Sequence, residues 1–147
     1  MTDRLLVDDH LLLRVILNNE PAVLRPTGAE IATTGLWYHR LCRAVSGSGV
    51  VGSMSRRLGE VADAAAAAAI ASIIELPDTV RLVSLRNLGW SMAKLLHGGA
   101  HLNLLSLEAL AAAQRLDAEI CLAEVDANEP LRSACEEFGV RVRSVAD

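Results

Sequence analysis

Short apolar runs of strand length alternate with helical patterns along almost the whole chain, and this alternation constrains the fold more than any other feature. Strand-like runs occupy residues 5–7, 79–85, 120–125 and 140–145. Helical patterns occupy residues 11–17, 36–45, 60–76, 87–96, 106–117 and 129–138. The alternation predicts an α/β fold with a mostly parallel central sheet, helices on both faces and right-handed crossovers. The run at 140–145 alternates apolar and polar residues, as expected of an edge strand.

Capping residues support several helix boundaries. The Thr33-Thr34 pair can accept hydrogen bonds from the first turn of the helix at 36–45. Ser106 is expected to cap the following alanine-rich helix, and Gly139 is expected to end the last helix. These signals add local support to the alternating pattern.

Three other stretches have a distinctive composition. Residues 64–74 are almost all alanine and isoleucine, which predicts a buried helix. Residues 18–28 contain two prolines and a glycine, and residues 46–55 are rich in glycine and serine, so both are expected to be loops. The second half has too few elements to build a core of its own, and we therefore expect one domain spanning residues 1–147.

Composition narrows the class of protein. The chain is 52% hydrophobic with a mean hydropathy of +0.31, yet it has no stretch approaching the ~20 uncharged residues of a membrane span. We expect part of this apolar surface to be covered by a second copy, which predicts a homodimer. The three scattered cysteines and the lack of an export signal favour the cytoplasm. A net charge of −4 argues against broad electrostatic coating of nucleic acid.

Acidic residues stand at corresponding places in this pattern. Asp8 closes the first apolar strand and Asp126 follows the strand at 120–125, while Glu108 is expected in the first turn of the alanine-rich helix. Ligands of parallel sheets bind at the carboxyl ends of the strands, and carboxylates are ligands of hard metal ions. The spacing therefore predicts an acidic site at that edge of the sheet.

Three stretches together resemble the PIN-domain family. Residues 5–8 (Leu-Leu-Val-Asp) and the Leu-rich helix after them resemble the opening of these proteins, and residues 105–113 resemble their helix with the third acidic residue. Residues 120–126, the amphipathic helix that follows and residues 139–142 resemble their ending. The similarity covers nearly the whole chain in order. Many bacterial PIN domains of this length are toxins of toxin–antitoxin pairs, metal-dependent endoribonucleases held silent by a small antitoxin protein.

The resemblance implies a nuclease site in which carboxylates hold Mg²⁺ or Mn²⁺. Asp8, Glu108 and Asp126 fall on the first, third and fourth acidic positions, so they are the implied catalytic and metal-binding residues. The second position, a glutamate early in the second helix, is occupied by Arg40. A cation there removes one ligand and repels the metal ion.

In one hypothesis the chain is an active enzyme. The chain would be a divalent-metal endoribonuclease of the toxin type, in which Asp9 or Glu124 stands in for the missing glutamate. Arg40, Arg56 and Arg57 would then be candidates for contacts with RNA phosphates. Its partners would be RNA and a small antitoxin protein.

In the other hypothesis the chain has no catalytic activity. The chain would be a catalytically inactive PIN-like domain with a binding or regulatory role, and Arg40 would occupy the place of the metal, bridged by Asp8, Glu124 or Asp126. Buried carboxylates without a metal need another cation or a proton, which gives this charge swap its physical basis. A third interpretation is that the resemblance reflects only the general geometry of a small α/β sheet.

Overall fold

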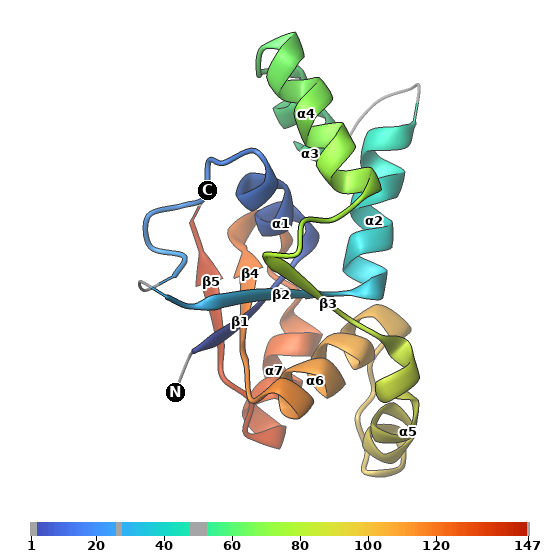
Figure 1. Cartoon of the computed structure of the whole chain (residues 1–147). Helices are drawn as coiled ribbons and strands as arrows, with labels where there is room; N and C mark the ends of the chain where they lie inside the picture. Colours follow the sequence, from blue (N-terminus) through green and yellow to red (C-terminus); the bar gives the residue numbers. More distant parts are fainter. Residues whose placement is uncertain (1–2, 26–27, 48–52, 147) are drawn as a thin grey trace.

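The computed structural model describes residues 3–25, 28–47 and 53–146 (Figure 1). The elements are β1 (Arg4–Val7), α1 (Asp9–Ile16), β2 (Glu30–Thr34), α2 (Gly35–Ser46), α3 (Ser53–Gly59), α4 (Asp63–Ile74), β3 (Val80–Val83), η1 (Leu85–Asn87), α5 (Gly89–His97), α6 (Leu104–Leu116), β4 (Glu119–Ala123), η2 (Glu124–Asp126), α7 (Glu129–Phe138) and β5 (Val142–Val145). The predicted α/β class is confirmed.

The five strands form one all-parallel sheet in the order β3-β2-β1-β4-β5. β1 is the central strand, with Leu6 opposite Ala32 of β2 on one side and Ile120 of β4 on the other. β5 lies at one edge, as the alternating pattern of its sequence predicted, and β3 lies at the other. The carboxyl ends of β1 and β4 are therefore neighbours.

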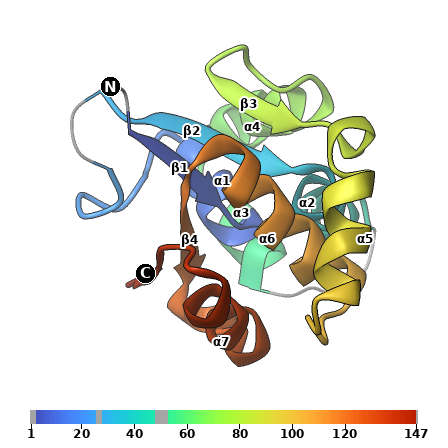
Figure 2. The same cartoon turned by 90° about the horizontal axis from the view of Figure 1, so that it is seen from below.

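Helices cover both faces of the sheet, because successive side chains of a strand point to opposite faces. Leu5 and Val7 of β1 belong to the core shared with α1 and α4, whereas Leu6 between them belongs to the core shared with α5, α6 and α7. Figure 2 shows these two layers, with α5, α6 and α7 in front of the strands and α1, α3 and α4 behind them. Helix α2 contributes to both cores through Trp37 and Leu41.

Strand β2 was not predicted. Its sequence, Glu-Ile-Ala-Thr-Thr, has a charged first residue and two threonines, so it lacks the apolar run that identified the other strands. The Thr33 hydroxyl is buried and donates to the carbonyl of Val7 at 2.9 Å, which satisfies it next to β1. Thr34 accepts a hydrogen bond from the amide of Trp37 and caps α2 as expected.

The segment 60–76 is shorter and more exposed than its sequence suggests. Helix α4 begins at Asp63, and the separate helix α3 precedes it. The expectation of a buried helix was wrong, because only Ala69 and Ile73 of α4 are buried. Figure 1 shows α4 extending from the sheet beside α3, so only one stripe of it packs on the core. Of the expected loop at 46–55, residues 48–52 lie outside the described residues.

Helix α6 begins earlier than expected. Asn103, and not Ser106, is its N-cap, since the Asn103 side chain accepts a hydrogen bond from the amide of Ser106 at 2.9 Å. The Ser106 hydroxyl instead accepts from the side-chain amide of Asn128. Glu108 consequently lies in the second turn of α6 and not in the first. No helix among the described residues is long and apolar enough to cross a bilayer.

Candidate functional site

The chain turns sharply after β1 and after β4, and each turn brings acidic residues to the carboxyl edge of the sheet. Asp8 directly follows β1, and Asp9 is the first residue of α1. Asp126 ends the short helix η2 that follows β4. The backbone amide of Asp8 donates to the carbonyl of Cys121 in β4, which fixes the two turns next to each other.

Asp8 is fully buried, and its carboxylate accepts hydrogen bonds from two backbone amides. One carboxylate oxygen accepts from the amide of Leu11 at 2.9 Å and caps α1, while the other accepts from the amide of Ala123 at 2.9 Å. Burial raises the pKa of Asp8 to about 7, with a smaller contribution from the charges of Asp9 and Asp126 and an opposing one from the two amides. Asp8 therefore joins the start of α1 to the end of β4.

Arg40 of α2 binds the two other aspartates of this edge. Its Nε and Nη2 donate to the two carboxylate oxygens of Asp9, the latter at 2.7 Å. The same Nη2 lies 2.5 Å from Oδ2 of Asp126. The Asp9 side chain is fully buried, whereas those of Asp126 and Arg40 are 32% and 35% exposed. The hydrogen bonds that Arg40 donates to Asp9 and Asp126, together with the two negative charges, raise the pKa of Arg40 above its already high value, although burial opposes them.

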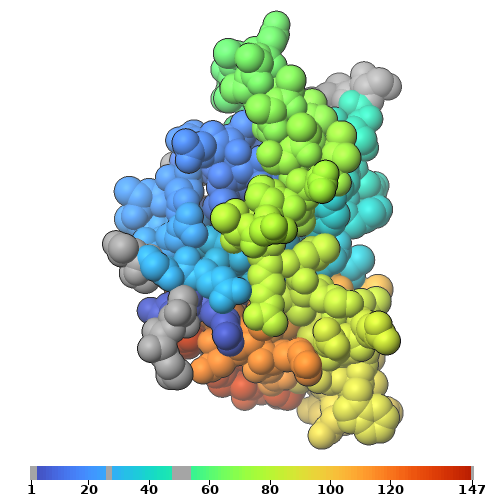
Figure 3. Space-filling view, viewed as in Figure 1, coloured from blue at the N-terminus to red at the C-terminus, as the bar shows by residue number. Residues whose placement is uncertain are grey.

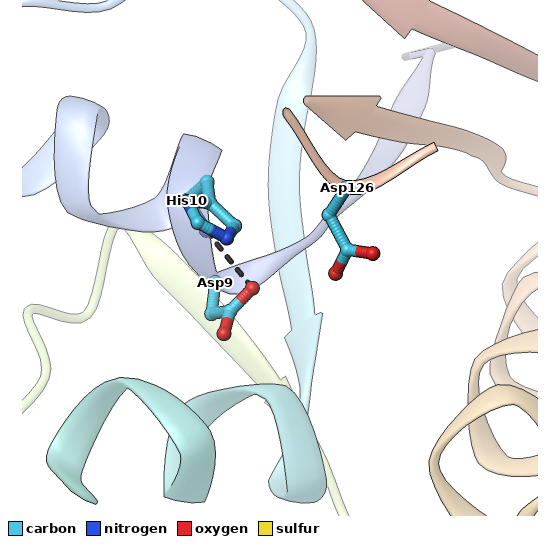
Figure 4. A group of neighbouring side chains, drawn as sticks. All are labelled: Asp9, His10 and Asp126. Carbon is cyan, nitrogen blue, oxygen red and sulfur yellow. Dashed lines mark hydrogen bonds between the residues drawn. The ribbon is translucent and has the colours of Figure 1, made fainter. Parts of the chain in front are cut away.

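Figure 4 shows the side chains of Asp9, His10 and Asp126 around one space at the start of α1. One potential ligand atom from each of these residues lies within 4.8 Å of the other two. The backbone amide of His10 also donates to Asp9 at 3.1 Å. This trio is therefore the one metal-type grouping among the described residues, and Arg40 donates to both of its carboxylates.

Glu108 has a different neighbour from the one expected. Its side chain is 1% exposed, and one carboxylate oxygen accepts from the amide of Leu36 at 2.8 Å. Leu36 lies in the first turn of α2, where unpaired N–H groups and the helix dipole favour a negative charge. Glu108 thus ties α6 to the start of α2, and it is not a member of the trio around Arg40.

The structure brings the predicted residues together only in part. Of the three acids named for the Arg40 charge swap, Asp126 is its partner, and its main partner is Asp9, which the sequence offered only as a substitute metal ligand. Glu124 is exposed at the start of η2. The remaining candidates for RNA contacts, Arg56 and Arg57, lie on α3.

These donor atoms do not fit a metal ion while Arg40 holds its observed position. A divalent ion would need carboxylate oxygens that already accept charge-assisted hydrogen bonds from the guanidinium, and it would lie beside a positive charge. Both oxygens of Asp8 are occupied by backbone amides as well.

No protein-family model and no curated protein matches this chain.

Proposed function

We propose that this chain is a catalytically inactive PIN-like domain with a binding or regulatory role, in which Arg40 takes the place of a divalent metal ion. The observation that carries the proposal is the bridge from Arg40 to Asp9 and Asp126. A guanidinium supplies the positive charge that a buried carboxylate requires, and its planar fork suits both oxygens of Asp9. The five-stranded parallel sheet is consistent with a domain of this kind.

Two other predicted ligands, Asp8 and Glu108, support the same proposal, because each has a structural partner. Asp8 caps α1 and binds the end of β4, and Glu108 binds the start of α2. Each carboxylate therefore has a use in joining two elements of the fold. A chain that keeps its acids for these contacts retains the scaffold without requiring catalysis.

A metal titration tests the proposal. The melting temperature of the wild-type protein is measured against Mn²⁺ and Mg²⁺, since an ion that binds only the folded state must raise it. We expect no saturable rise for the wild type and a saturable rise for Arg40→Glu, which restores a carboxylate and removes the competing cation. Arg43→Glu is the matched control, because Arg43 is an exposed residue of the same helix. A saturable rise in the wild type that Asp126→Asn abolishes would overturn the proposal.

The grouping of Asp9, His10 and Asp126 favours a second candidate function, that of a Mg²⁺- or Mn²⁺-dependent endoribonuclease of the toxin type. This function requires Arg40 to leave the two aspartates. Its test is cleavage of a labelled RNA by the purified protein with and without Mn²⁺, with Asp126→Asn as the inactive control. A metal-dependent activity lost in that variant would establish it and exclude the first proposal.

A further inference from the structure

The surface formed by β3, η1 and α5 exposes apolar side chains that a folded chain normally covers. Trp90 is 81% exposed, Leu85 54% and Leu82 44%. They lie in consecutive elements, at the start of α5, in η1 and in β3. Figure 3 shows the yellow-green and yellow atoms of this part of the chain as one continuous strip. Trp is enriched at the centres of protein interfaces, so its exposure here indicates a protein-binding surface.

The same surface contains an open sheet edge. β3 is an edge strand of the sheet and pairs only with β2 among the described residues. The outer side of an edge strand presents backbone N–H and C=O groups that an extended segment of another protein can pair with. Exposure of both Arg81 and Leu82, which are consecutive in the strand, agrees with its peripheral position.

The charged residues of this stretch of the sequence are all cationic. Residues 79–107 contain Arg81, Arg86 and Lys94 but no aspartate or glutamate, although the whole chain has a net charge of −4. Arg81 lies 3.9 Å from Glu30 of β2. Arg86 and Lys94 are exposed and form no ion pair with any other described residue. The surface is thus both apolar and cationic.

We propose that the surface formed by Leu82, Leu85, Trp90, Arg81, Arg86 and Lys94, the β3–α5 surface, docks an extended, acidic segment of another protein. The segment would add a strand to β3, place apolar side chains against Trp90 and the leucines, and place carboxylates near Arg86 and Lys94. The interaction uses none of the residues of the Arg40 site, so it holds whether or not that site binds a metal.

Charge and shape favour this occupant over two others. A symmetric pairing of two copies through the same surface would bring its cationic residues toward one another, which is unfavourable. A nucleic acid would satisfy the charges, but exposed leucines offer little to phosphates or to base edges. An acidic peptide satisfies the cations, the apolar side chains and the open strand edge together.

Intrinsic fluorescence gives a direct readout, since the chain has two tryptophans and the other, Trp37, is 1% exposed. The probe is a short peptide of alternating glutamate and valine, titrated at low salt, with a lysine–valine peptide as its charge-reversed control. We expect the glutamate peptide to shift the emission to shorter wavelength and to protect Trp90 from iodide quenching. Binding is also followed with a labelled peptide, so that Trp90→Ser can be measured.

Two surface variants define the site. Arg86→Glu and Trp90→Ser are each expected to weaken binding of the glutamate peptide by about tenfold or more, whereas Arg115→Glu, an exposed control on α6, changes it less than about twofold. The proposal is overturned if the glutamate peptide does not bind, if the lysine peptide binds equally, or if the three variants behave alike. It is also overturned if a uridine oligonucleotide, and not the glutamate peptide, protects Trp90 from iodide quenching. A further contrary result would be protection that appears without any peptide as the protein concentration rises, together with a dimer in sedimentation.

Discussion

Arg40 of α2 is bound by both carboxylate oxygens of Asp9, a residue at the start of α1 whose side chain is fully buried. A third contact of the same guanidinium, to Asp126, reaches the segment after β4. One cation therefore joins three segments that are far apart in the sequence. The charge that a metal-binding acidic site would receive from solution is supplied here by the chain itself.

Replacing Arg40 with methionine should destabilise the protein, because it leaves the carboxylate of Asp9 buried without a counter-charge. Loss of one partner of a fully buried pair costs about 3–5 kcal/mol. The Arg40 side chain is 35% exposed, so we expect a smaller loss of about 2–3 kcal/mol in the free energy of unfolding. Urea denaturation at neutral pH measures it.

The control for this variant is Arg43→Met on the exposed side of the same helix, which should change stability by less than about 0.5 kcal/mol. Equal effects of the two substitutions would show that the Asp9 pair contributes nothing specific. Adding Asp9→Asn to Arg40→Met should recover part of the lost stability, because it removes the unpaired charge.

The raised pKa of Asp8 predicts a pH dependence of stability. The pKa is about 7 in the folded protein against an ordinary value of 3.8, so the folded state binds this proton more tightly than the unfolded state. The contribution is fully present below pH 4 and is lost as the pH rises through 7. At about 1.4 kcal/mol per pKa unit, the loss is on the order of 4 kcal/mol at most.

The Asp8→Asn variant isolates this contribution, since it cannot ionise. It loses one acceptor of the backbone amides, which lowers its stability by a similar amount at every pH. We therefore expect the stability of the wild type to fall relative to that of the variant between about pH 4.5 and pH 7.5. Parallel stability curves in urea titrations at these pH values would contradict the raised pKa.

The sequence predicted the acidic edge better than it predicted the partners of the acids. The position of Asp8 follows from the end of β1, which an apolar run reveals, whereas Asp126 lies beyond the end of β4, at the end of η2. The pairing of Arg40 with Asp9 depends on how α1 and α2 are rotated against each other, and no local pattern encodes this rotation. An arginine in place of an expected ligand was the signal available, and it identified the cation but not its main partner.

The misplaced elements have different causes. β2 was not predicted because its two threonines interrupt the apolar run. Thr33 donates a hydrogen bond to β1, and Thr34 caps α2. Glu108 was expected in the first turn of α6, but Asn103 caps that helix and leaves the carboxylate facing the start of α2. The hydrogen bond from Thr33 to β1 is a tertiary contact, whereas the start of α6 is set by a local cap, Asn103 in place of the predicted Ser106.

Glu108→Ala should destabilise the protein by about 2 kcal/mol, because the amide of Leu36 loses its buried acceptor and α2 loses a negative charge at its N-terminus. Glu108→Gln keeps an acceptor and should cost about half as much. Glu137→Ala, at an exposed position of α7, is the control and should have little effect. If Glu108 had no structural role, the three variants would unfold at the same denaturant concentration.

Lysine substitutions at two consecutive alanines of α4 test how this helix packs. Ala68 is exposed and Ala69 is 3% exposed. Both variants lose the same helix propensity, so a difference between them reports burial alone. We expect Ala68→Lys to change the free energy of unfolding by less than about 0.5 kcal/mol and Ala69→Lys to lower it by about 2–4 kcal/mol. A helix buried all round, as the composition of residues 64–74 suggested, would be destabilised by both substitutions. Sedimentation of the Ala68→Lys variant also tests the predicted homodimer. If a second copy covers α4, the lysine should dissociate the dimer into monomers.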